Sequence, residues 1–223
     1  AGTLSDVDAE NLRVALAAAK SGDVSRTRSA MDSLQDPLAR KIALWALVDS
    51  CAEAMSLFEL DAARRDLAGW PRPGRRESAA EKQLSVSGLD PDRVIAWFGG
   101  GDPATAEGAM ALASAYQAKG QNQKAVDLIR HVWRDEVFEA DAQSAMAARF
   151  GSMLTADDYA RRADILLYGP QGPAARAIVA LLPTDQQAAA EVRIAYRQNA
   201  GNANSLYATL TPADQASPGV AFE

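Results

Sequence analysis

The chain has 223 residues, of which 48% are hydrophobic and 23% are charged, and its formal net charge is −6. This length can bury the core of one or two domains, and no apolar run approaches the roughly 20 residues that a membrane-spanning helix needs. The acidic balance, with Lys and Arg scattered along the chain, argues against a nucleic-acid binder, which normally carries a basic face.

Ala- and Leu-rich segments carry apolar residues at three- and four-residue spacing, and short breaks of Gly, Pro, Asp, Ser or Thr separate them. The pattern predicts about twelve helices of roughly 10 to 17 residues. These helices are expected to begin after Ser5, Gly22, Asp36, Met55, Pro73, Asp90, Pro103, Gly120, Glu139, Thr155, Gly172 and Thr184. No stretch alternates with period two, so we expect no sheet.

The breaks between these segments are short, which makes neighbouring helices antiparallel. The predicted fold is therefore all-α: an irregular, TPR-like α-superhelix, or solenoid, of about six hairpins spaced by roughly 30 to 35 residues. We expect it to form a single domain over residues 1–223. One hairpin matches the small, aromatic and turn positions of a tetratricopeptide repeat, without its first tryptophan and closing proline, at Leu112, Ala113, Tyr116, Gly120, Ala125, Ile129 and Val132.

Side-chain and glycine caps explain several of the expected helix ends. Asp36, Asp90 and Asp102 each place an acceptor directly before a proline, whose fixed φ suits a first helical turn. Four glycines are expected to end helices in the left-handed conformation: Gly22, Gly120, Gly151 and Gly169.

The densest cluster of acids and bases lies in residues 148–169 and is interpreted as a helix start rather than an active site. Thr155 is a natural N-cap, and Asp158 stands three residues later, where the acid of a capping box belongs. Arg161 and Asp164 are three residues apart and are expected to pair on the helix surface.

Other residues that could carry chemistry lack the partners that the chemistry needs. His131 is expected to be a partly exposed helical residue, because a general base needs a positioned partner. Gly99–Asp102 lacks the lysine of a phosphate loop, and Asp90 and Asp92 lack the other ligands of a calcium loop. Cys51 cannot form an internal disulfide, and no Cys/His spacing suits a metal. The sequence therefore assigns no catalytic, cofactor-binding or metal-binding residue.

Two groups of aromatic and basic residues also receive a structural interpretation. Three tryptophans lie on apolar helix faces and are expected to pack in the core rather than to stack on sugars: Trp45, Trp97 and Trp133. The fourth, Trp70, precedes Pro71 in a loop. Three basic residues of that Pro/Gly-rich loop are expected to form a solvated turn: Arg72, Arg75 and Arg76.

An ordered set of residues between Asp90 and Tyr168 carries a family resemblance. The set runs through Arg93–Phe98, Pro103–Thr105, Gly108, Leu112–Ala113, Ala115–Tyr116, Gly120, Ala125, Leu128–Arg130, Trp133–Arg134, Phe138, Phe150–Gly151, Leu154–Thr155, Asp158, Arg161 and Asp164–Leu167. It resembles the N-terminal superhelical, U-shaped domain of the soluble lytic murein transglycosylases. Asp36–Arg40, Trp45 and Trp70–Pro71 fit this family more loosely. Two positions depart from it, because the family often has His at Tyr159 and Trp at Tyr168.

The resemblance implies a bacterial scaffold that carries no chemistry of its own. In the family, a separate C-terminal lysozyme-like domain cleaves the MurNAc–GlcNAc bond of peptidoglycan and leaves a 1,6-anhydromuramyl end. Its single glutamate, unlike the paired carboxylates of most glycosidases, stands in Glu-Ser-x-Phe and is followed by Gly-Ala-x-Gly-Leu-Met-Gln. The only Glu-Ser pair here is Glu77–Ser78, and no Gly-Leu-Met-Gln occurs. No catalytic residue can be carried over, and the chain alone is predicted to be inactive.

Two functions follow as expectations. In the first, the chain is the periplasmic, non-catalytic part of a lytic transglycosylase that positions the catalytic domain of the same polypeptide and holds glycan strands or cell-wall and division proteins. A start without Met fits a removed leader, and an ending at Thr211–Glu223 without a capping helix fits a longer parent chain. In the second, it is a free-standing TPR-like adaptor whose groove binds a peptide or protein segment.

Overall fold

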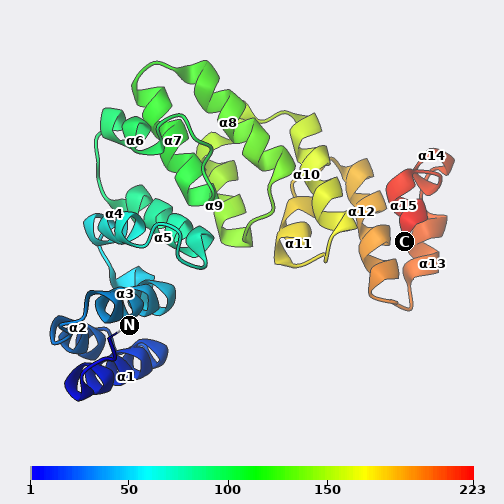
Figure 1. The fold of residues 1–223 in the computed structure, drawn as a ribbon. Helices are drawn as coiled ribbons and strands as arrows, with labels where there is room; N and C mark the ends of the chain where they lie inside the picture. The colour runs from blue at the N-terminus through cyan, green and yellow to red at the C-terminus, as the bar shows by residue number, and fades with distance from the viewer. Residues whose placement is uncertain (1) are drawn as a thin grey trace. The chain divides into compact units, whose positions relative to one another are not determined.

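The computed structural model describes residues 2–223, and within this range the chain is all-α, as predicted (Figure 1). Fifteen α-helices occur within residues 2–223: α1 (Asp6–Ser21), α2 (Val24–Asp32), α3 (Pro37–Cys51), α4 (Leu57–Asp66), α5 (Pro73–Val86), α6 (Pro91–Phe98), α7 (Ala106–Ala118), α8 (Asn122–Asp135), α9 (Ala140–Phe150), α10 (Ala156–Tyr168), α11 (Pro173–Val179), α12 (Thr184–Arg197), α13 (Ala203–Ala208), α14 (Pro212–Gln215) and α15 (Pro218–Phe222). Two 3-10 helices, η1 (Ala52–Ala54) and η2 (Gly151–Met153), join α3 to α4 and α9 to α10.

The twelve predicted helices correspond to α1–α12, and each begins within two residues of its predicted start. The three short helices α13–α15 were not predicted, and two of them lie in Thr211–Glu223, the segment that was expected to end without a capping helix. The Thr211 side chain caps α14 by accepting a hydrogen bond from the Asp214 N–H at 3.2 Å, and Pro218 opens α15. Helices of four to six residues are too short to show apolar periodicity.

Contacts between Cα atoms divide the chain into two compact units. The first contains the residues up to Val94 together with Gly100–Gly108, and the second contains Ile95–Gly99 together with Ala109–Glu223. Compact units of this kind also occur as successive parts of one solenoid, so the single domain over residues 1–223 stays a prediction.

In the first unit, α1, α2 and α3 pack side by side, and the hairpin of α4 and α5 packs against α3 (Figure 1). Small apolar residues fill the space between the first three helices: Ala15, Ala30, Leu34, Ala39 and Ala43. A buried carboxylate also fixes a loop, because Glu81 accepts hydrogen bonds from the N–H groups of Ala104 and Thr105 at 2.7 and 2.9 Å. Gly108 lies against this carboxylate so closely that a Cβ atom there would overlap Glu81.

In the second unit, helices α8 to α13 pack mainly against helices one or two places away along the chain, as in an α-solenoid. Helix α10 contacts α8, α11 and α12, and the short helix α15 returns to contact both α10 and α12. The largest fully buried side chains of this unit include Trp133, Phe150, Ile129, Met146 and Leu167. These residues make α8, α9 and α10 the centre of its core.

The predicted helix ends are partly confirmed. Gly22 and Gly120 are left-handed, with φ of 80° and 73°, but Gly151 and Gly169 are not. The chain continues from Gly151 into η2, and the carbonyl of Gly169 instead accepts a hydrogen bond from Arg197 at 2.6 Å.

Two of the three predicted Asp-Pro starts are confirmed, since the Asp36 and Asp90 side chains accept hydrogen bonds from N–H groups of the first turns of α3 and α6. The third start is wrong. Helix α7 begins after Thr105 rather than at Pro103, and the Thr105 hydroxyl accepts the Gly108 N–H at 2.9 Å.

Candidate functional site

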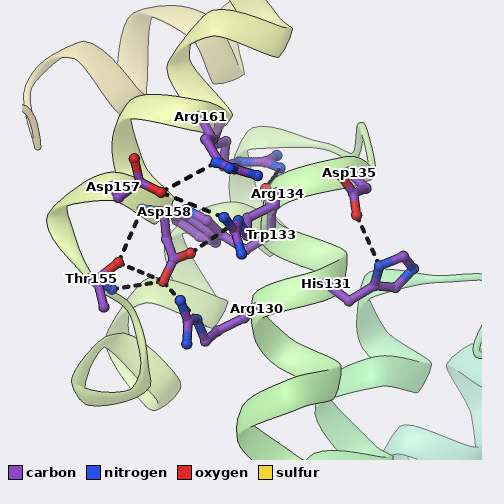
Figure 2. Close-up of polar contacts among 10 residues, drawn as sticks. Arg130, His131, Trp133, Arg134, Asp135, Thr155, Asp157, Asp158 and Arg161 are labelled. Carbon is purple, nitrogen blue, oxygen red and sulfur yellow. Dashed lines mark hydrogen bonds and ion pairs between the residues drawn. The ribbon is translucent and has the colours of Figure 1, made fainter.

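The charged cluster of residues 148–169 forms a joint between α10 and α8 (Figure 2). Asp158 lies in the first turn of α10 and is 0% exposed. Its Oδ2 atom accepts hydrogen bonds from the Thr155 N–H and hydroxyl, at 2.8 and 3.0 Å, and from Arg130 Nε at 3.0 Å. Its Oδ1 atom lies 3.2 Å from Arg134 Nε. The predicted capping box is confirmed, and the two arginines of α8 extend it into an interhelical ion-pair cluster.

The surroundings of Asp158 keep it ionised. Burial raises its pKa, but hydrogen bonds from Thr155 and Arg130 outweigh burial and hold the pKa below the ordinary value of 3.8. A general acid needs the opposite shift, toward the working pH. The cluster therefore has the electrostatics of a structural joint and cannot donate a proton at neutral pH.

The next residue to reach α8 from α10 is Arg162, which is 0% exposed. Its Nη1 atom donates to the carbonyls of Trp133 and Glu136 at 3.0 and 2.8 Å, and its Nε atom donates to Gln143 Oε1 at 2.5 Å. The rings of Phe138 and Trp133 lie 4.0 and 5.0 Å from its Cζ atom. Among residues 2–223, no carboxylate lies within ion-pair distance of it. Burial lowers the pKa of Arg162 to about 10, so the guanidinium is still charged at neutral pH.

Hydrogen bonds from an arginine to backbone carbonyls near the end of an earlier helix, like those of Arg162, recur along the chain. Arg197 lies 35 residues further on and donates to the carbonyls of Leu167 and Gly169, at the end of α10. Arg76 donates in the same way to the carbonyls of Leu67, Trp70 and Pro71, which follow α4. The last carbonyls of a helix have no intrahelical partner, and in each case an arginine of a following helix donates to carbonyls at or beyond the end of an earlier helix.

The ion pair between α8 and α10 also recurs, with its charges exchanged. Arg130 on α8 pairs with Asp158 on α10, 28 residues later. Asp164 on α10 pairs with Arg193 on α12 at 2.7 Å, 29 residues later. The predicted pair of Arg161 with Asp164 is therefore wrong, because Asp164 pairs with Arg193. Arg161 pairs instead with Asp157, one turn earlier, at 3.2 Å.

Replacing Thr155 tests the cap of α10. Thr155→Ala removes the hydroxyl that accepts the Asp158 N–H at 3.3 Å and donates to Asp158 Oδ2. We expect a loss of about 1 kcal/mol in the free energy of unfolding, measured by urea denaturation. Thr155→Ser keeps the hydroxyl and serves as the control. Unchanged stability of Thr155→Ala would contradict the capping role.

The remaining sequence candidates lie apart from this joint. His131 is a half-exposed residue of α8, as predicted, and its Nδ1 atom lies 2.9 Å from Asp135 Oδ2 one turn later. Gly99–Asp102 is a connection between α6 and α7, and Glu77 lies on α5, where it pairs with Arg64 at 2.7 Å. Within residues 2–223, no group of three or more His, Cys, Asp or Glu side chains is placed to hold a metal ion.

The basic loop before α5 is only partly the solvated turn that was predicted. Arg72 and Arg75 are exposed and share Asp49 Oδ2, at 2.9 and 3.4 Å. Arg76 is buried and donates hydrogen bonds to backbone carbonyls of the preceding loop, so the prediction of a solvated residue is wrong for Arg76. No sequence pattern marks this role of Arg76, because its partners are the backbone carbonyls of Leu67, Trp70 and Pro71.

The four tryptophans differ in how deeply they are buried. Trp133 is fully buried and packs edge-on against Tyr159 at 5.2 Å, as expected of a core residue. Trp45, Trp70 and Trp97 are half-buried. The indole N–H of Trp45 donates to the Pro71 carbonyl at 2.9 Å, which joins α3 to the loop before α5.

A groove of about 800 Å³ lies in the first unit, and sequence reasoning did not find it. One wall is a single face of α5, which presents Arg75, Ser78, Ala79, Lys82 and Gln83 at three- and four-residue spacing. The opposite wall is formed by residues 49–54 at the end of α3 and in η1. The groove carries two basic and two acidic side chains, and its volume is in the range of ligand-binding clefts.

No helix among residues 2–223 is both long and apolar enough to cross a membrane. A scan against family models, a search of curated proteins and a search of solved structures each found no match to this chain.

Proposed function

We propose that the chain is the non-catalytic superhelical region of a periplasmic peptidoglycan lytic transglycosylase. It would position a C-terminal catalytic domain of the same polypeptide, which cleaves MurNAc–GlcNAc bonds to 1,6-anhydroMurNAc products. The superhelix itself would hold glycan strands or partner proteins.

The observation that carries this proposal is the role of the residues on which the family resemblance depends. Arg130, Trp133, Arg134, Thr155 and Asp158 form the buried joint between α8 and α10. Such residues fix the angle and register of two helices, and Asp158 is held ionised. Their arrangement supports a structural role for these residues, and the proposal therefore assigns the chemistry to another domain.

The groove beside α5 is the best candidate for the strand-holding surface. Its basic and acidic side chains balance, so it suits a ligand that is bound by hydrogen bonds rather than by net charge. Ser78 and Gln83 can both donate and accept, and the small side chain of Ala79 leaves room between Arg75 and Lys82.

Purified sacculi test the proposal in two ways. We expect the chain to co-sediment with peptidoglycan and to release no anhydromuropeptides from it. Ala79→Trp should fill the groove and reduce co-sedimentation several-fold, because the indole would occupy the space proposed to hold the glycan strand. Ser85→Trp adds the same ring to an exposed position of α5 outside the groove and is the matched control. Release of anhydromuropeptides by the chain alone would show an active site in it.

The groove also favours the second candidate, a TPR-like adaptor that binds a peptide or protein segment. Under that function the chain would not sediment with sacculi. The downstream reading frame would then lack Glu-Ser-x-Phe and Gly-Leu-Met-Gln, whereas the transglycosylase proposal requires both. The sedimentation assay and the reading frame therefore decide between the two candidates.

A further inference from the structure

A second cavity, of about 430 Å³, lies within the second unit between α10, α12 and the segment of α14 and α15. It shares no lining residue with the groove beside α5, and its volume is in the range of ligand-binding clefts. Buried apolar side chains make up much of its lining: Ala163, Leu167, Leu182, Ala190 and Val220. A hydrocarbon chain placed against these side chains is taken out of water, which favours its binding.

The basic side chain of this lining is not available to a ligand. Arg193 is 5% exposed, and its Nη1 atom pairs with Asp164 Oδ1 at 2.7 Å. The ring of Tyr168 lies 4.5 Å from its Cζ atom, and a Cβ atom on Gly219 would lie 2.6 Å from Nη1. The guanidinium is therefore part of the cavity wall, where it offsets the charge of one aspartate.

The acidic side chains of the lining keep free acceptor atoms. Asp164 on α10 is paired through Oδ1 alone, and its side chain is 64% exposed. The N–H and carbonyl of Asp214 on α14 bind Thr211 and Ser217, but no hydrogen bond or ion pair among residues 2–223 involves its carboxylate. With two aspartates and one arginine as its charged groups, the lining carries one excess negative charge.

We propose that this cavity binds a primary alkyl ammonium group, such as the one at the end of a lysine side chain. The ammonium carries three donors and no acceptor, so it suits the free carboxylate oxygens of Asp164 and Asp214. Its single positive charge neutralises the excess negative charge of the lining, and its alkyl stem packs against the apolar side chains. The inference does not rest on the proposed function, because it uses only the lining of this cavity.

Other classes of ligand fit this lining less well. An anion would meet two carboxylates, which disfavours its binding. A zwitterion leaves the excess negative charge in place, because its own charges cancel. A metal ion needs more ligands than two carboxylates supply, and within residues 2–223 no group of three or more His, Cys, Asp or Glu side chains is placed to hold one. The lining therefore favours an organic cation with one charge.

Nuclear magnetic resonance titration of the isotope-labelled chain with n-pentylamine at pH 7 tests the site. The amine is charged at this pH, as a lysine side chain is. We expect saturable shifts of the amide signals of α10, α12 and α14. Both n-pentanol, which lacks the charge, and methylamine, which lacks the stem, should bind at least about tenfold more weakly. The absence of saturable shifts in these helices, or equal binding of either comparator, overturns the inference.

The methylamide of Nα-acetyl-lysine presents the same ammonium and stem on a peptide backbone, and it separates two sources of the ligand. Binding tighter than that of n-pentylamine supports the site and identifies a lysine of a peptide as its ligand. Equal or weaker binding supports the site with a free alkylamine as its ligand. The same amide signals should shift in both titrations.

Two pairs of variants locate the ligand. Asp214→Asn should weaken the binding of n-pentylamine about tenfold, whereas Asp185→Asn makes the same change in net charge on α12, outside the lining, and should leave binding unaltered. Ala189→Trp should fill the cavity and abolish binding, and Ala188→Trp, at an exposed position outside the lining, is its control. If Ala189→Trp fails to fold, the Asp214→Asn chain decides. Full binding by a folded Asp214→Asn chain places the ammonium elsewhere and overturns the assignment.

Discussion

Arg162→Ala is expected to lower the free energy of unfolding by about 4 kcal/mol. The change leaves the carbonyls of Trp133 and Glu136 and the Gln143 side chain without their donor, and a buried unsatisfied group costs about 1–3 kcal/mol. It also opens a cavity beneath Phe138 and Trp133. For a chain of this size, the midpoint of thermal unfolding should fall by roughly 8–16 °C, measured by circular dichroism.

Arg161 provides a matched control one position earlier in α10. Its side chain is 59% exposed and pairs only with Asp157, so Arg161→Ala should stay within about 0.5 kcal/mol of the unaltered chain. Arg162→Met refills most of the volume and should recover about 1 kcal/mol, since the carbonyls still lack donors. Hydrogen exchange should accelerate in α8 and α10 but not in α1–α3. Equal effects of the two alanine variants would contradict the buried role of Arg162.

Asp158→Ala is expected to cost about 3 kcal/mol, because it removes one partner of a buried ion-pair cluster. The estimate is at the low end of the range for such changes, since Arg130 and Arg134 are partly exposed and can turn toward water. The neighbouring residue Asp157 is 70% exposed, and Asp157→Ala should cost less than about 1 kcal/mol. Chemical denaturation at pH 7 measures both variants.

The pKa of Asp158 gives its contribution a defined pH dependence. Its folded pKa is held below the ordinary value of 3.8, so the folded state binds the proton less tightly than the unfolded state does. The stabilisation is complete above about pH 5 and is lost as the pH falls below 3.8 through the folded pKa. The stability difference between the unaltered chain and Asp158→Asn should therefore shrink in acid. A difference that stays constant from pH 7 to pH 3 would rule out an ionised Asp158 as its source.

Local signals made much of the fold predictable. Caps such as Asp36, Asp90 and Thr155 act within one turn of the chain, and the structure confirms that each side chain accepts a hydrogen bond in the first turn of its helix. Apolar periodicity is also local, so the positions of α1–α12 followed from it. The prediction of an Arg161–Asp164 pair is wrong because the i, i+3 rule considers only residues of the same helix. Asp164 pairs instead with Arg193, which lies on another helix.

The joint itself could be predicted only in part. The family resemblance contains Arg130, Arg134 and Asp158, but their pairing joins residues 24 or more positions apart, and that depends on which helices meet. Arg162 was missed for a different reason. Arginine is almost never fully buried unless it is paired, and its partners here are backbone carbonyls, which no side-chain pattern reveals.

The exchange of charges between the pairs Arg130–Asp158 and Asp164–Arg193 has a consequence for folding. Repeat chains are prone to misassembly, in which a helix docks onto the wrong copy of its neighbour. If α12 docked onto α8 in the way that it docks onto α10, Arg193 would meet Arg130 in the place of Asp164, and two like charges would be brought together. Docking of α10 onto a second α10, as between two chains, would likewise bring Asp158 to Asp164. The opposite order of charges in these two pairs thus disfavours the docking of α12 onto α8.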